Sequence, residues 1–140
     1  MNFARVGLAA LAAWVASIPV GYVVNEVLLA GVHGANAAAL RPAADVAANV
    51  PFAYLFMLVG FLVFAYAYAK GYEGSSGAVE GLRFGVIVAL LVDCFVVSWW
   101  WATVPIDWTM AGAMMADYVV ELSLYGAIVG VVYKPLPGAA

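Results

Sequence analysis

Four long apolar runs dominate this sequence, and they restrict the chain to one class of fold. The runs cover residues 3–32, 50–69, 81–104 and 108–133. A helix needs roughly 20 apolar residues to cross the hydrocarbon core of a bilayer, and each run reaches that length. Only 9% of the 140 residues are charged, whereas a soluble domain carries about 25%. The sequence therefore predicts an all-α membrane protein, a four-transmembrane-helix bundle in which residues 1–140 form a single domain.

Basic residues predict the orientation of this bundle. Arg5, Lys70, Arg83 and Lys134 all fall on the side that bears both termini and the middle loop, and only Arg41 falls on the other side. Lysine and arginine accumulate in cytoplasmic segments of membrane proteins. We therefore expect a multi-pass protein whose two termini are cytoplasmic and whose first partner is the lipid bilayer.

Small residues recur at every fourth position in three of the runs. The first run has Ala9, Ala13, Ser17 and Gly21, the third has Gly81, Gly85 and Ala89, and the fourth has the pair Gly126 and Gly130. Residues four apart share one face of a helix, and small residues there let helix backbones approach closely in lipid. We expect the ridges of the first and third runs to pack near the bundle centre, unless one of them serves a partner chain.

Polar groups continue these small-residue faces into the membrane. At a helical rise of about 1.5 Å per residue, Asp93 lies roughly 15 Å from the cytoplasmic end of its run. Glu121 and Asp117 lie at roughly 20 and 25 Å, and Asn25 and Glu26 lie at roughly 30 Å, near the outer boundary. If these side chains face one another, they form a stepped line from mid-membrane to the outer surface, with His33 at its mouth.

Two interpretations of the buried acids stay open. A charged carboxylate at the bilayer centre costs about 2.5–3.5 kcal/mol, and no basic residue lies at the depth of Asp93, Asp117 and Glu121. We therefore do not expect all three to be ionised. Either they share protons or hold a cation as a functional site, or they join helices by hydrogen bonds in their protonated form.

Several kinds of chemistry are not indicated. Di-iron helix bundles use repeated Glu-x-x-His motifs, and this chain has one histidine, His33. No Ser-His-Asp, Cys-His or zinc-type spacing is present. We therefore expect no enzyme activity, no metal, no cofactor and no nucleic-acid partner.

Three stretches carry a resemblance to known proteins. They are residues 70–74 (KGYEG), 80–85 (EGLRFG) and 126–135 (GAIVGVVYKP). These stretches resemble a family of short bacterial membrane proteins that have about this length, four predicted helices and no assigned activity. The resemblance implies the bacterial inner membrane and the same fold, and it implies no functional residue. Residues 5–7 (RVG) and 83–85 (RFG) open two runs similarly, so we expect two helical hairpins that are related by duplication.

These observations favour an interaction or accessory component of a membrane assembly, present as a homo-oligomer or bound to other membrane subunits. A second hypothesis is a small transporter or channel for protons or a cation, using Asp93, Asp117, Glu121 and Glu26. A third is a binder of lipid or pigment between aromatic helices. The transporter requires the acids to face a common polar space, whereas the accessory component requires them to be satisfied by hydrogen bonds.

Overall fold

The computed structural model describes residues 1–133, and all regular structure in that part of the chain is helical. Four helices are long and apolar enough to cross a membrane, and they span Phe3–Leu28, Ala43–Lys70, Gly77–Thr103 and Trp108–Tyr133. The prediction of an all-α chain with four such helices is confirmed. Lys134 and Pro135, used above for orientation and resemblance, lie outside the described residues.

The first two long helices form an antiparallel hairpin. Its elements are α1 (Phe3–Tyr22), the π-helical η1 (Val23–Leu28), α2 (Ala30–Ala35), the 3₁₀ turn η2 (Ala37–Ala39) and α3 (Ala43–Lys70). The helix expected over residues 3–32 breaks at Leu29, which leaves helical geometry. The helix expected to begin at residue 50 begins seven residues earlier, because alanines, which are good helix formers, extend it beyond the apolar run.

The last two long helices form a second hairpin. Its elements are α4 (Gly77–Val92), the π-helical η3 (Asp93–Val97), α5 (Ser98–Thr103) and α6 (Trp108–Tyr133). The start of α4 lies four residues before the expected residue 81. Glu80 lies in its first turn, where it accepts hydrogen bonds from the backbone N–H groups of Glu73 and Ser75 and from the Ser75 hydroxyl. The α3–α4 loop is thereby tied to the helix that follows it.

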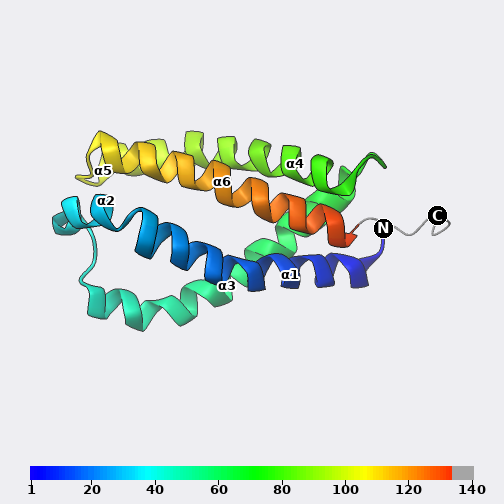
Figure 1. The fold of residues 1–140 in the computed structure, drawn as a ribbon, viewed down its shortest axis with the longest axis horizontal. Helices are drawn as coiled ribbons and strands as arrows, with labels where there is room; N and C mark the ends of the chain where they lie inside the picture. Colours follow the sequence, from blue (N-terminus) through cyan, green and yellow to red (C-terminus); the bar gives the residue numbers. More distant parts are fainter. Residues whose placement is uncertain (134–140) are drawn as a thin grey trace.

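Helix α6 lies between α4 and α1, and α3 packs chiefly on α1 (Figure 1). The start of α1, the α3–α4 loop and the end of α6 lie at one end of the bundle, while α2 and α5 lie at the other (Figure 1). The two small-residue ridges therefore do not meet each other. The α1 ridge is buried in the cluster that joins α1, α3 and α6, and the α4 ridge is buried against α6.

The closest contact in the bundle joins α4 to α6 through glycine. A Cβ on Gly81 would collide with the carbonyl oxygen of Gly126, and a Cβ on Gly126 would collide with that of Gly81. Gly130 meets the carbonyl of Gly77 in the same way, and Gly85 meets that of Leu122. These helices touch backbone to backbone, which only residues without a side chain permit.

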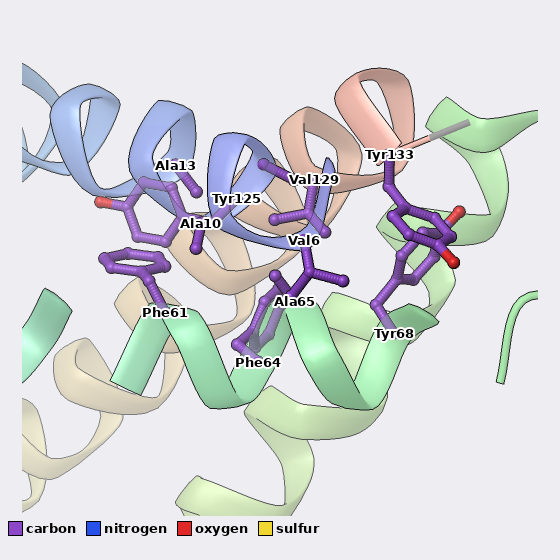
Figure 2. Close-up of a cluster of buried hydrophobic side chains, with 11 residues drawn as sticks. Val6, Ala10, Ala13, Phe61, Phe64, Ala65, Tyr68, Tyr125, Val129 and Tyr133 are labelled. Carbon is purple, nitrogen blue, oxygen red and sulfur yellow. The ribbon is translucent and has the colours of Figure 1, made fainter. Parts of the chain in front are cut away.

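Apolar and aromatic side chains fill the space between the two hairpins. Figure 2 shows Phe61 against Tyr125 at one end of this cluster, with ring centroids 5.2 Å apart in an edge-to-face arrangement. Nearer the loop end, the Tyr68 ring lies edge-on to Tyr133 at 6.0 Å, and its hydroxyl donates to the Gly77 carbonyl.

At the opposite end, one polar pair holds the two connections together. Asn36 donates to the Asp107 carboxylate at 3.2 Å and accepts from the Asp107 backbone N–H at 3.0 Å. The same carboxylate accepts from the Met110 N–H at 2.7 Å, so it caps the start of α6. This pair fixes α2 beside the mouth of the polar region described next.

Candidate functional site

Asp93 stands where α4 changes to a π-helical turn. It is the first residue of η3 and one helical turn beyond Ala89. Its side chain is only 6% exposed, and its Oδ1 atom has no hydrogen-bond partner in the described part of the chain. Single π-helical turns within α-helices occur frequently at functional sites. The geometry thus places an unsatisfied carboxyl group in the middle of a candidate membrane span.

Helix α6 supplies the other two acids on one face. Asp117, Glu121 and Tyr125 follow one another at intervals of four residues, so their side chains are stacked along the helix. Asp117 Oδ1 is also buried without a hydrogen-bond partner among residues 1–133, whereas the Glu121 carboxyl group interacts with the Tyr125 hydroxyl. Nearly all buried polar groups in native proteins are paired. The unpaired oxygens of Asp93 and Asp117 are exceptions to this rule within the described part of the chain.

Tyr118 connects the acids of the two helices. It interacts electrostatically with Asp117, Glu121 and Asp93, and it is partly buried among them. Asp117 in turn interacts with His33 of α2. A series of ionisable groups therefore runs from His33, near the α2 end of the bundle, through Asp117 to Glu121, with Asp93 beside it.

The Glu121 carboxyl group lies where three helices meet. Its Oε1 atom is 3.8 Å from the position that a Cβ on Gly21 would occupy, and the Tyr54 hydroxyl is 3.9 Å from the same position. Gly21 of α1 thus leaves room for a carboxyl from α6 and a hydroxyl from α3. Tyr54 was not predicted as a site residue, because nothing in the sequence relates α3 to this depth of α6.

Two residues expected in the acidic line are not part of it. Glu26 is exposed on η1, so it does not face the buried acids. The Asn25 amide donates to the Gly21 carbonyl at 3.1 Å, which satisfies the α1 backbone locally. The expected stepped line therefore contains Asp93, Asp117 and Glu121, and it reaches the surface at His33 rather than at Glu26.

A groove of about 250 Å³ adjoins Glu121. Its walls come from α3, α4 and α6 and are formed by Met57, Gly60, Phe61, Phe64, Val88, Val92, Tyr118, Glu121, Leu122 and Tyr125. Met57 and Gly60 are exposed, so the groove opens on the side of the bundle. Its walls are apolar apart from Glu121 and the two tyrosine hydroxyls.

The acids are spread along the bundle rather than gathered. Among residues 1–133, no three side chains of His, Cys, Asp or Glu come together as a group that could hold a metal ion. Asp117 and Glu121 interact with each other and with Tyr118 and Tyr125, whereas Asp93 interacts with Tyr118. Such an arrangement suits the transfer of a species that needs only one oxygen at a time.

No protein-family model, curated protein or solved structure matches this chain. The resemblance to short bacterial membrane proteins therefore stays a prediction. The function has to be argued from the geometry of the polar residues alone.

Proposed function

We propose that this chain is a small, non-enzymatic, multi-pass protein of the bacterial inner membrane that transports protons by means of Asp93, Asp117 and Glu121. The observation that carries the proposal is the burial of Asp93 Oδ1 and Asp117 Oδ1 without a hydrogen-bond partner among the described residues, together with Glu121, whose carboxyl group interacts with the Tyr125 hydroxyl. If Asp93 and Asp117 served only to join helices, those oxygens would be paired. Ionisable residues inside membrane-spanning helices mark ion pathways and proton relays.

The separation of the acids favours the proton over a metal cation. A calcium ion takes about six to eight oxygen ligands, and the carboxyl groups of Asp93, Asp117 and Glu121 do not converge. A proton needs a single carboxyl oxygen and moves between neighbouring groups. His33, which interacts electrostatically with Asp117, is partly exposed near the α2 end of the bundle.

Apolar clusters lie on both sides of the acids. On one side, Tyr125 packs against Phe61; on the other, the buried residues Val97 and Met110 belong to a second cluster that packs against Tyr118. A proton therefore crosses the bundle only when the packing of one of these clusters changes. The proposed transporter is thus a carrier rather than an open pore.

The distribution of basic residues supports the orientation of this carrier. Arg5, Lys70 and Arg83 belong to the bundle end that bears the start of α1 and the α3–α4 loop, and Arg41 belongs to the other end. By the positive-inside rule, His33 then faces the outside. The exposed rings of Trp99 and the stacked pair Trp101 and Trp108 lie at the outer end, where an interfacial belt is expected.

Proton flux into vesicles tests the proposal. The purified chain is reconstituted in liposomes that hold a pH-sensitive dye, and a membrane potential is imposed with potassium and valinomycin. We expect flux above that of empty vesicles for the wild type and for Glu26→Gln, whose side chain is exposed. Glu121→Gln and Asp93→Asn should lower the flux to the level of empty vesicles. If the wild type itself gives no more flux than empty vesicles, the proposal is wrong.

An accessory role is a second candidate, favoured by the outer part of α3. Residues 43–53 of this helix are exposed throughout, whereas its inner part is packed on α1. A helix that leaves the bundle in this way offers a surface to a second copy or to another membrane subunit. Native mass spectrometry from mild detergent tests this role, and a monomer without bound subunits would argue against it.

A further inference from the structure

The groove beside Glu121 has a composition that the proton pathway does not explain. A chain of carboxyl groups needs no apolar space, yet Met57, Gly60 and Val92 line a volume of about 250 Å³ that ends at Glu121. Ligand sites in proteins are typically apolar hollows with a few polar groups that fix the orientation of the ligand. Here the polar groups are one carboxyl and two hydroxyls.

The charge of the groove indicates the kind of molecule it accepts. No basic residue contributes to its walls, and Glu121 is the one acid among them. An anion would be repelled by the ionised carboxylate, whereas a cation would neutralise it. The aromatic rings of Phe61, Phe64 and Tyr118 add faces that attract a cation, and the surrounding methyl and methylene groups favour an organic cation over a hydrated metal ion.

The Tyr125 hydroxyl is a partner of the Glu121 carboxyl group beside the groove. Tyr125 lines the groove and is 2% exposed. It lies one turn from Glu121 on the same face of α6. An ionised Glu121 carboxylate would accept a hydrogen bond from this hydroxyl, so the pair is arranged to stabilise a negative charge opposite a bound cation.

We propose that the groove between α3, α4 and α6 binds a lipophilic organic monocation, such as a quaternary ammonium compound, with its charged centre at Glu121. This inference rests on the proposed proton-handling role of Glu121 and names the substrate that exchanges with the proton. Because Met57 and Gly60 are exposed on the side of the bundle, the cation enters laterally from the bilayer, where lipophilic cations concentrate.

Binding and proton release are linked at this site. A protonated, neutral Glu121 loses its proton when the cation arrives, so the charge in the groove is conserved. The titratable groups that face Glu121 are Asp117 and Tyr118 on its own helix, Tyr125 one turn on, and Tyr54 from α3. On the α4 side, Asp93 at the start of η3 interacts with Tyr118. The adjoining part of α1 presents Gly21, which has no titratable side chain. The proton leaves by way of Asp117 toward His33.

Calorimetry of the full chain in mild detergent tests the inference, with benzyltrimethylammonium as the probe. Neopentylbenzene, which has the same shape without the charge, is the control ligand. A pH-indicator dye in weakly buffered solution reports proton release in parallel. We expect the wild type to bind the cation and release protons, and Glu121→Gln to bind it at least about tenfold more weakly and to release none.

A second pair of variants tests the location of the site without touching a carboxyl group. Gly60→Leu places a side chain in the groove, where nothing lies within 4 Å of the glycine, and should weaken cation binding by at least about tenfold. Gly112→Leu adds the same side chain at an equally open glycine of α6 away from the groove, and should bind as the wild type does. Melting temperatures confirm that each variant is folded.

The outcomes separate this inference from the proposed function. Absence of cation binding by a wild-type protein that conducts protons in vesicles would overturn the inference alone. Equally tight binding of neopentylbenzene would show that the groove binds neutral apolar molecules without regard to charge, and it would also overturn the inference. Unchanged cation binding by Gly60→Leu would overturn the inference as well. Cation binding by a protein that shows no proton flux would remove the proposed transport function and leave the groove as a binding site.

Discussion

Gly81 of α4 and Gly126 of α6 lie so close that each occupies the space that a Cβ on the other would need. The same close backbone approach is repeated by Gly77 with Gly130. It determines the relative position of the two elements that carry Asp93 and Glu121. The small residues of the sequence thus serve the polar site indirectly, by fixing the helices on which it is built.

Alanine at Gly126 should destabilise the bundle. The added Cβ would lie 3.0 Å from the Gly81 carbonyl carbon and 3.0 Å from the Gly85 nitrogen, and it would collide with the Gly81 carbonyl oxygen. Overpacking of this kind costs about 1–3 kcal/mol. Thermal unfolding in detergent, followed by circular dichroism, should show a lower melting temperature for Gly126→Ala. Gly112→Ala in the same helix, with nothing within 4 Å, should melt at or above the wild-type temperature, and equal losses in the two variants would contradict the packing argument.

The Asn36–Asp107 pair should stabilise the outer end of the bundle. Asp107→Ala removes the cap of α6 and the hydrogen bond that the Asp107 carboxylate accepts from Asn36, while the bond from the residue 107 backbone N–H to Asn36 is kept. The loss of a helix cap alone costs about 0.5–2 kcal/mol. A double-mutant cycle of Asn36→Ala and Asp107→Ala, measured by thermal unfolding, should show coupling. Asp45→Ala, at an exposed position in the first turn of α3, serves as the control and should change stability little. If the losses of stability from the two single substitutions add up to the loss in the double variant, the interaction between Asn36 and Asp107 contributes nothing to stability.

Glu80 should keep the α3–α4 loop ordered. Its carboxylate accepts from the backbone N–H groups of Glu73 and Ser75, and each hydrogen bond to a charged group contributes about 1.5–3 kcal/mol. Glu80→Ala should therefore speed hydrogen exchange at these two amides. Glu73→Ala removes a carboxylate that makes no such contact and should leave the exchange rates unchanged. If the Glu73 and Ser75 amides exchange as slowly in Glu80→Ala as in the wild type, other contacts hold the loop.

The orientation can be checked with single cysteines. In a Cys94→Ser background, Ala38→Cys places a thiol at an exposed position of η2, and Ser75→Cys places one in the exposed α3–α4 loop. An impermeant maleimide should label Ala38→Cys in intact bacterial cells whose outer membrane has been permeabilised. It should label Ser75→Cys only after the inner membrane has been opened. The reverse pattern would place the start of α1 outside.

The apolar runs allowed the number of long helices to be predicted, but not all of their ends. The fourth run coincides with α6, because Asp107 caps its start and also ends the apolar stretch. Hydropathy underestimates α3, since residues 43–49 are polar or small and still helical. It overestimates the first helix, which breaks at Leu29 within an apolar run. Hydropathy reports affinity for lipid, whereas helix ends depend on capping and local backbone preference.

The buried acids were identifiable as candidates, but their relations were not. The interval of four residues places Asp117, Glu121 and Tyr125 on one face of α6 from the sequence alone. Only packing shows that Tyr118 links them to Asp93, that His33 lies beside Asp117, and that Glu26 is exposed. A contact between helices depends on their rotation and crossing, which a single helix does not encode.

The sequence by itself determined that four apolar helices form, because helical spacing and the requirement to satisfy backbone groups within each span leave no alternative structure in lipid. It also determined which faces are small and which residues are acidic. The tertiary structure alone decided that both small faces pack toward α6, that Tyr54 and Gly21 meet Glu121, and that a groove opens beside it. These features arise because close backbone approach at Gly81 and Gly126 sets the spacing of the helices, and every other contact follows from that spacing.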